Sequence, residues 1–284
     1  MLQHLPKIIV ILGQTATGKS DLAVKIAKKI DGEIISADSR QVYRGLNIGT
    51  GKITEKEMKN VPHHLLDVVS PKNKFTVIEY KKLAEEKIEE IIARGKTPII
   101  CGGTGFYIDT LTKGIVFPEV PPNIKLRKTL NKKSEIELLK MLKKLDARRA
   151  KSIDSKNKVR LIRAIEIAKA LGSVPKITEE TPMYKFIKVG LHLPPDKLKR
   201  KIEKRVKKMF KAGLLEEIKK LKKAGVSDER LREFGFEYFK PTSEKVITQT
   251  LKYAKRQMTW FKRDKEIKWF ENKYMALNFI LKIL

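Results

Sequence analysis

Cysteine and histidine are scarce in this sequence. The 284 residues include one cysteine, Cys101, and four histidines, so no internal disulfide can form and no Cys/His cluster has the spacing of a zinc site. Long apolar runs are also missing. The longest, at residues 8–12 and 279–284, fall well short of the roughly 20 residues that span a bilayer, and no signal-peptide pattern precedes them. We therefore expect a protein of a reducing compartment, the cytoplasm, with no membrane association.

Acidic residues are too few to balance the basic ones. The chain has 63 Lys and Arg against 33 Asp and Glu, a net charge of +30, and 41% of its residues are hydrophobic. This apolar share is large enough for a folded core. The charge is segregated, because residues 1–116 hold 18 basic and 13 acidic residues, whereas residues 117–284 hold 45 and 20. Such charge repels itself unless an anion neutralises it, so nucleic acid is the partner class we expect.

The first part of the chain alternates short β-branched runs with amphipathic stretches. Residues 7–12, 32–37 and 97–101 are apolar runs, while residues 20–30 and 76–95 have apolar side chains at helical spacing. This alternation is typical of a parallel sheet covered by helices. The sequence therefore predicts an α/β core in this region.

A proline-rich stretch at residues 117–123 interrupts the pattern, because consecutive prolines lack donors and force an extended path. Residues 134–146 and 157–172 then have helical periodicity. Residues 185–195 are expected to return to the sheet as a strand, with a basic helix starting near Asp196. We predict a helical subdomain at 118–186, inserted into a core made of residues 1–117 and 187–284 with basic C-terminal helices.

A phosphate-binding motif follows the first apolar run. Gly13, Gly18, Lys19 and Ser20 fit the G-x-x-x-x-G-K-[ST] pattern, between a strand-like and a helix-like segment. In this motif the backbone N–H groups converge on phosphate oxygens, the lysine adds a positive charge, and the serine hydroxyl is placed to bind Mg²⁺. A P-loop NTPase-like fold that binds a diphosphate or a triphosphate is therefore predicted, and the motif alone does not say which.

Two further apolar runs end in polar side chains. Asp38 and Ser39 follow the second run, and Thr104 stands between Gly103 and Gly105 after the run at 97–101. Ligands bind at the carboxyl ends of the strands in open α/β sheets, so we expect these side chains near the P-loop. A P-loop NTPase commonly has a magnesium-binding aspartate after such a strand, whereas here there is a threonine. Asp38 could hold Mg²⁺, cap a helix or act on a substrate.

These motifs together resemble one family, the tRNA dimethylallyltransferases, also called tRNA isopentenyltransferases. The resemblance runs in order through nearly the whole chain. Its matching segments are "GQTATGKS" at 13–20, "ADSRQVYRGLNIGTGK" at 37–52, "PHHLLD" at 62–67, "GGTGFY" at 102–107, "VRLIRAIEIAKALG" at 159–172, "RVKKMFKAGLLEE" at 205–217 and "YAKRQMTWFKRD" at 253–264.

The resemblance implies a reaction and assigns residues to it. The family transfers a dimethylallyl group from dimethylallyl diphosphate to N6 of the adenosine on the 3′ side of the tRNA anticodon. Asp38 is implied as the general base and Thr104 as its partner in the reaction channel, while Ser20 would bind Mg²⁺. No role follows for Glu233 or Glu237, because residues 231–241 match the family only loosely. The residues implied to bind the diphosphate are Gly13, Gln14, Thr15, Ala16, Thr17, Gly18, Lys19, Ser20 and Arg256.

The same resemblance implies where tRNA is bound. A helical row with Lys156, Arg160 and Arg163 at i, i+4 and i+7 would share one face of the inserted subdomain. We expect a monomer that binds the anticodon stem-loop. The residues implied as tRNA contacts are Asp38, Ser39, Arg40, Gln41, Thr104, Arg127, Val159, Arg160, Leu161, Ile162 and Arg163.

Three other functions remain open at this point. An adenylate isopentenyltransferase would use the same donor and a free nucleotide, but that acceptor does not require so basic a second half. A P-loop small-molecule kinase would consume ATP. An RNA-binding module without catalysis would use the P-loop only to respond to a nucleotide.

Overall fold

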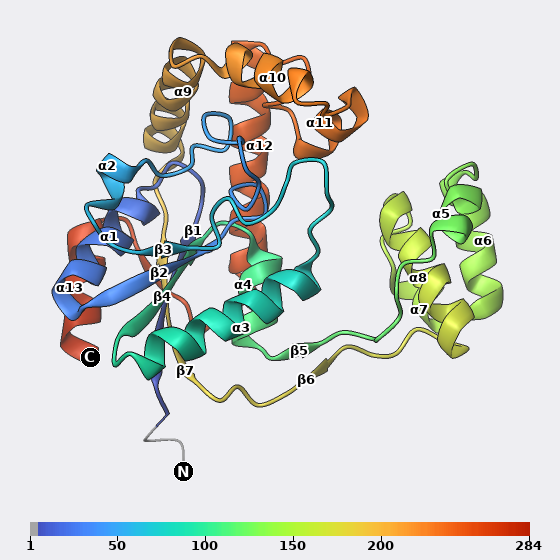
Figure 1. The fold of residues 1–284 in the computed structure, drawn as a ribbon. Coiled ribbons are helices and arrows are strands. Elements are labelled where there is room, and N and C mark those ends of the chain that lie inside the picture. The colour runs from blue at the N-terminus through green and yellow to red at the C-terminus, as the bar shows by residue number, and fades with distance from the viewer. Residues whose placement is uncertain (1–4) are drawn as a thin grey trace. The chain divides into compact units, whose positions relative to one another are not determined.

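The computed structural model describes residues 5–284, which fold into two compact units (Figure 1). The first unit comprises the chain up to Gly114 and from Thr181 onwards, and the second comprises residues 115–180. The predicted fold class, a parallel P-loop-like α/β core with an inserted helical part and C-terminal helices, is confirmed. The second unit begins and ends a few residues before the expected boundaries, because a strand forms before the prolines and β7 already begins at Lys185.

A six-stranded sheet lies at the centre of the first unit. Its strand order is β3-β2-β4-β1-β7-β8, and every neighbouring pair is parallel. The inner strands are continuous apolar runs because helices cover both of their faces. As predicted, the chain returns from the insert to the sheet, where β7 pairs with β1. The strands are β1 (Lys7–Gly13), β2 (Gly32–Ala37), β3 (His63–His64), β4 (Thr97–Gly102), β7 (Lys185–Leu191) and β8 (Lys268–Phe270).

Side chains of β1 alternate between two apolar cores. Ile8 and Val10 join the core under α3 and α4, whereas Ile9 and Ile11 join the core under α1 and α13. This is the period of two that a strand buried on both faces requires. The helices concerned are α1 (Lys19–Ile30), α3 (Val77–Ala93), α4 (Gly105–Thr112) and α13 (Lys273–Ile283).

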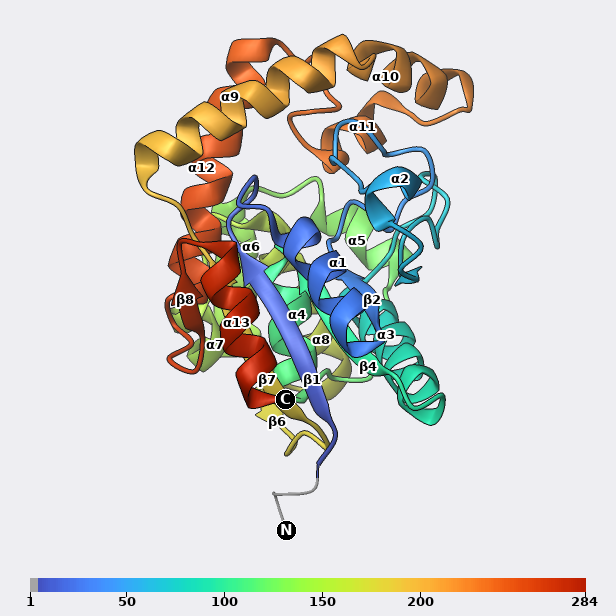
Figure 2. The same cartoon turned by 90° about the vertical axis from the view of Figure 1, so that its left-hand side faces the viewer.

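Four further helices lie at the end of the sheet where β1 finishes, as both views show (Figure 1, Figure 2). Buried side chains of α10 and α11, among them Leu214 and Phe234, pack with Val42 and Leu46 from the segment after β2, and α9 packs against α12. None of the helices within residues 5–284 is long and apolar enough to cross a membrane. The helices of this layer are α9 (Pro195–Lys211), α10 (Leu214–Lys223), α11 (Asp228–Phe234) and α12 (Ser243–Phe261), and α2 (Glu55–Met58) follows the same segment after β2.

The second unit has an apolar core of its own, with Leu138, Leu142 and Leu161 fully buried. Ser134 caps α6 through a capping box and Asn157 caps α8, so both helices begin where the sequence indicates. Lys156 therefore precedes α8, and its expected place in a helical row is wrong. The elements are β5 (Ile115–Val116), antiparallel to β6 (Thr178–Glu179), and helices α5 (Ile124–Leu130), α6 (Glu135–Leu145), α7 (Ala147–Ser152) and α8 (Lys158–Leu171).

Candidate active site

Three loops meet at the carboxyl edge of the sheet. β1 leads into the P-loop, β2 leads into Asp38, and β4 leads into Gly103 and Thr104. Because β2, β4 and β1 are direct neighbours, their carboxyl ends deliver these three segments to one place. The backbone N–H of Thr104 donates to the carbonyl oxygen of Ala37 at 3.1 Å, which joins the second loop to the third.

The P-loop is shaped by glycine at its first position. Gly13 has a φ of +128°, and a side chain there would collide with the carbonyl oxygen of Leu191 on β7. The loop also binds itself: Lys19 Nζ donates to the carbonyl oxygen of Gln14 at 2.6 Å, and the Thr17 hydroxyl donates to the same oxygen at 2.8 Å. α1 starts at Lys19, directly after the loop, so the N–H groups of its first turn lie next to the loop. The arrangement is that of an anion site.

Burial lowers the pKa of Lys19 to about 8, although Cys101 and Asp38 favour its charged form. The lysine therefore loses its proton as the pH rises through about 8. If its charge attracts the diphosphate substrate that the resemblance implies, kcat/KM for that substrate will fall about tenfold per pH unit above that value, because kcat/KM reports the free enzyme. Arginine keeps its charge in this range, so a Lys19→Arg enzyme should lack the fall. An equal fall in both enzymes would exclude Lys19 as its cause.

Gln257 of α12 connects two of the loops, and sequence reasoning missed it. Its Oε1 accepts the backbone N–H of Thr15 at 2.8 Å, and its Nε2 donates to the carbonyl oxygen of Gly103 at 2.8 Å. The side chain is buried. One of the P-loop amides predicted to bind phosphate is thus already engaged by a side chain. The only signal in the sequence is a polar residue on the buried face of α12, between Ala254 and Phe261.

Asp38 and Thr104 occupy neighbouring loops, as predicted. Asp38 Oδ1 accepts the backbone N–H groups of Arg40 at 2.9 Å and Gln41 at 3.3 Å. Thr104 Oγ1 accepts the N–H of Ser39 at 3.0 Å and donates to the Ser39 hydroxyl at 3.3 Å. These bonds fix the Asp38 carboxylate through one oxygen and join Thr104 to Ser39, the next residue in the chain. The catalytic roles of Asp38 and Thr104 stay predictions.

Arg205 is a second residue that sequence reasoning missed. It lies on α9 at the edge of the buried stripe, and its guanidinium bridges the Thr15 hydroxyl, at 3.1 Å, and the carbonyl oxygen of Thr50, at 2.8 Å. Gly51, with a φ of +58°, leaves the space that the guanidinium fills. Burial lowers the pKa of Arg205, against the attraction of Asp38 and Glu237. The site therefore has a second cation beside the P-loop.

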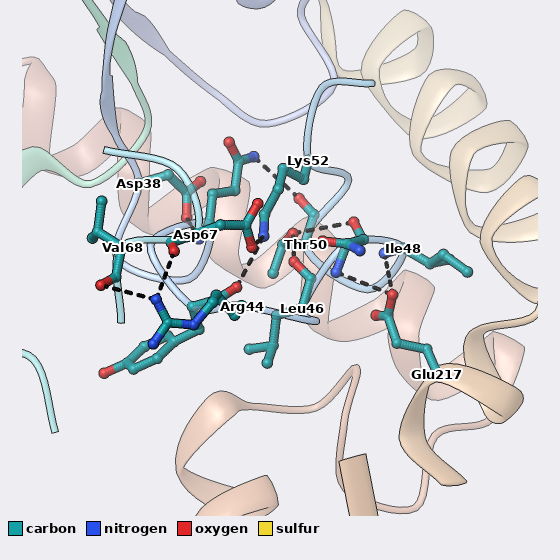
Figure 3. Close-up of polar contacts among 12 residues, drawn as sticks. Asp38, Arg44, Leu46, Ile48, Thr50, Lys52, Asp67, Val68 and Glu217 are labelled. Atoms are coloured by element: carbon teal, nitrogen blue, oxygen red, sulfur yellow. Dashed lines mark hydrogen bonds and ion pairs between the residues drawn. The ribbon is translucent and has the colours of Figure 1, made fainter. Parts of the chain in front are cut away.

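The loop that Arg205 contacts is held by a buried carboxylate. Glu217 of α10 accepts the backbone N–H groups of Asn47 at 3.0 Å, Ile48 at 2.7 Å and Gly49 at 3.1 Å (Figure 3). The Tyr238 hydroxyl donates to the same carboxylate at 2.9 Å. Three converging amides and a hydroxyl satisfy the buried charge. Glu217 thereby positions the turn that carries the Thr50 carbonyl.

Lys52 cross-links the segment after β2. Its Nζ donates to Asp67 at 2.6 Å and to the carbonyl oxygen of Tyr43 at 2.9 Å, so it joins two distant points of that segment (Figure 3).

Glu237 is a further charged group of this region. Burial raises the pKa of Glu237 to about 7, although Arg40 and Arg205 lower it. Glu237 is therefore a titratable group near Asp38, for which no role is predicted from the sequence.

Among residues 5–284, Arg256 makes no hydrogen bond or ion pair with the P-loop. It is exposed on α12, and its guanidinium lies 5.8 Å from the centre of the Tyr253 ring. The neighbouring Gln257 makes the P-loop contact instead. A role for Arg256 in diphosphate binding stays a prediction.

The predicted tRNA residues of the second unit differ in exposure. Val159 and Arg160 are exposed, whereas the side chains of Leu161 and Ile162 are buried in the core of the unit. α8 turns these two side chains inward, and a contact of this stretch with tRNA stays a prediction.

Arg127 and Arg163 are engaged by the same buried carboxylate. Arg127 donates to Glu166 from Nε at 2.9 Å and from Nη2 at 2.7 Å, and Arg163 donates to Glu166 and to the carbonyl oxygen of Val120. Burial would raise the pKa of Glu166, but the two arginines lower it to about 2. Both guanidinium groups therefore tie α5 and the stretch before it to α8.

Loss of this carboxylate should loosen the second unit. In a Glu166→Gln variant we expect the free energy of unfolding of the second unit to fall by about 2 kcal/mol. This is less than the loss expected for a fully buried ion pair, because the arginines are partly exposed. The folded-state pKa lies below the unfolded value, so the stabilisation is present above about pH 4.5 and is lost as the pH falls towards 2. Hydrogen exchange of the α8 amides measures this loss of stability. Equal protection in Glu166→Gln and in the exposed control Glu119→Gln would refute the assignment.

Comparison with known proteins gives one consistent result. The profile of the IPP transferase family matches residues 41–264. A tRNA dimethylallyltransferase of Anoxybacillus flavithermus is 38% identical, over 93% of this chain and 90% of that protein. The crystal structure of a tRNA isopentenylpyrophosphate transferase from Bacillus halodurans is similar with a TM-score of 0.71 and 34% identity, over 97% of this chain and 96% of that one. A eukaryotic dimethylallyltransferase acting on tRNA is similar with a TM-score of 0.75 and 28% identity, over 90% of this chain and 70% of that one.

Proposed function

The chain belongs to the IPP transferase family, and from this we propose that it is a tRNA dimethylallyltransferase. It transfers the dimethylallyl group of dimethylallyl diphosphate to N6 of the adenosine on the 3′ side of the tRNA anticodon and releases diphosphate. One observation supports the proposal most strongly. The P-loop, Asp38 and Thr104 lie together at one edge of the sheet, in a chain that matches tRNA dimethylallyltransferases along most of its length.

The P-loop binds the diphosphate in this proposal. The first N–H groups of α1, which begins at Lys19, have no partner within the helix and are available at the loop, and Lys19 and Arg205 add two positive charges beside it. Lys19 exchanges its bond to the Gln14 carbonyl for the diphosphate. The negative charge that develops on the leaving group is thereby stabilised, which is the largest electrostatic demand of the reaction.

Mg²⁺ is the cofactor we propose, and the residues present fit it. The Ser20 hydroxyl is exposed at the start of α1, and no cluster of three or more His, Cys, Asp or Glu side chains within residues 5–284 could hold a metal alone. A hard cation that binds one hydroxyl and takes its other ligands from phosphate oxygens and water suits such a site. When bound, Mg²⁺ supplies further neutralisation of the diphosphate charge.

Asp38 takes the proton in the group transfer. The N6 nitrogen forms a bond to C1 of the dimethylallyl group, the C1–O bond breaks, and its electron pair leaves with the diphosphate. The N6 nitrogen of adenine is a poor nucleophile because its lone pair is delocalised into the ring, so removal of its proton by a carboxylate assists the attack. The backbone bonds from Arg40 and Gln41 hold Asp38 Oδ1, and Thr104, which bonds to Ser39 next in the chain, is its proposed partner in the reaction channel.

The tRNA must present an unstacked adenosine to this site. Extrusion of a base costs a few kcal/mol, which contacts to the RNA backbone must offset. The exposure of Val159 and Arg160 on α8, and the position of residues 38–41 directly after β2, support these residues as the contacts.

Incubation with labelled dimethylallyl diphosphate and Mg²⁺, with unmodified tRNA or AMP as acceptor, tests the function. We expect label in tRNA and none in AMP. Label in AMP alone would identify an adenylate isopentenyltransferase. Consumption of ATP without transfer from dimethylallyl diphosphate would identify a kinase, and binding of RNA with neither reaction would identify a non-catalytic module.

A further inference from the structure

Five lysines form one row along α9. Lys197, Lys201, Lys204, Lys208 and Lys211 follow each other at intervals of four, three, four and three residues, which keeps them on one face of a helix. All five are exposed. At about 1.5 Å per residue the row extends for about 21 Å. We call these five residues the lysine stripe.

No acidic side chain lies within the lysine stripe. The two acidic residues of α9, Asp196 and Glu203, lie outside the stripe, on the flank of the helix that also has Lys199, Arg200 and Lys207. Within residues 5–284, none of the five ammonium groups of the stripe pairs with a carboxylate, in contrast to Lys219 and Lys222 of α10, which pair with Glu216 and Asp228. The stripe therefore repels itself unless an outside anion neutralises it.

The stripe borders the active site. Arg205 lies four residues after Lys201 and three before Lys208, so it is their neighbour on the helix surface. From that position its guanidinium reaches Thr15 of the P-loop and the carbonyl oxygen of Thr50. The stripe thus lies about one helix width, roughly 10 Å, from the loop predicted to hold the diphosphate. The flank with Glu203 is turned further from Arg205.

We propose that the lysine stripe binds the phosphate backbone of the RNA whose adenosine enters the active site. The proposal rests on the proposed function. An RNA chain with one base inserted beside the P-loop carries its neighbouring phosphates across this part of the surface, and a row of unpaired ammonium groups is complementary to them. A membrane surface fits less well, because the apolar side chains of α9 are buried against the protein and none is exposed for insertion.

Two triple variants of equal charge test the proposal. Lys201, Lys204 and Lys208 are changed to Gln in one, and Lys199, Arg200 and Lys207 in the other. All six residues are exposed on the same helix, so the changes in net charge and in helix content are matched. The probes are an unmodified anticodon stem-loop RNA, measured between about 50 and 200 mM salt, and vesicles of phosphatidylserine and phosphatidylcholine.

The stripe variant should bind the RNA about tenfold more weakly at the higher salt concentration, and the slope of log K against log salt should become shallower by about 2, because three phosphate contacts are lost. Its KM for RNA should rise by a similar factor, while kcat at saturating RNA stays within about twofold. In the other variant each changed residue lies three or four positions from Asp196 or Glu203, which already offset its charge, so this variant should change much less in each measurement. Equal losses in both variants, or no loss in the stripe variant, would overturn the proposal, and so would a loss confined to vesicle binding.

The same experiment separates this proposal from the proposed function. Prenyl transfer by the wild-type protein is measured alongside. If the wild type transfers no prenyl group, the function fails, and the difference in RNA binding between the two variants still decides the role of the stripe. If transfer occurs and the stripe variant keeps the wild-type KM for RNA, the stripe proposal fails and the function stands.

Discussion

Turnover of tRNA by an Asp38→Asn enzyme is expected to fall by about 10² or more, because asparagine cannot take the N6 proton. The substitution is close to isosteric. Asparagine Oδ1 can still accept the backbone N–H groups of Arg40 and Gln41, so the loop after β2 should keep its shape. Single-turnover transfer from dimethylallyl diphosphate, at saturating tRNA, measures the effect on the chemical step.

Affinity provides the control for Asp38. The dissociation constant for tRNA should change by less than about threefold, since the loss is confined to the transition state. The thermal unfolding midpoint should remain that of the wild type. A turnover within about threefold of the wild-type value would remove Asp38 from the mechanism, whereas a parallel loss of turnover and tRNA affinity would show that it only binds RNA.

The second large effect is expected at Arg205. In an Arg205→Ala enzyme, kcat/KM for dimethylallyl diphosphate should fall by about 10², because a cation beside the P-loop and two hydrogen bonds are lost together. The bridge between Thr15 and the carbonyl oxygen of Thr50 requires a forked side chain. Lysine is a point charge and cannot span both, so Arg205→Lys should recover only part of the loss.

Lys199→Ala is the matched control for Arg205. It removes one positive charge from the same helix on the flank that is turned away from the P-loop. This variant should keep the wild-type kcat/KM for the diphosphate substrate. If Arg205→Ala and Lys199→Ala behave alike, the guanidinium has no part in diphosphate binding and its two contacts serve only to hold α9.

The parts of the site that follow the strands could be predicted from the sequence. Each of β1, β2 and β4 is a short apolar run that ends in a recognisable polar or glycine-rich segment, and parallel strands bring such segments to one edge. Local signals also marked the helices of the insert, where Ser134 and Asn157 cap α6 and α8. These features depend on short stretches of chain, which is why the sequence alone was sufficient.

The residues that complete the site could not be found in this way. Arg205, Glu217 and Gln257 come from helices far along the chain, and their partners are backbone groups whose positions only the folded structure defines. In the insert, charge alone did not show that Arg163 has an internal partner. Arg163 lies three residues before Glu166, so an ion pair within α8 was an alternative in the same sequence, and its contact with tRNA stays a prediction.

The transfer of a dimethylallyl group to adenosine N6 is best checked by mass analysis of the nucleosides from tRNA treated with this enzyme. The tRNA is incubated with dimethylallyl diphosphate and Mg²⁺, digested, and compared with the same digest from the Asp38→Asn enzyme. We expect N6-dimethylallyladenosine at the position 3′ to the anticodon in the wild-type sample and almost none in the variant. Unmodified adenosine at that position in both samples, with dimethylallyl diphosphate unconsumed, would contradict it.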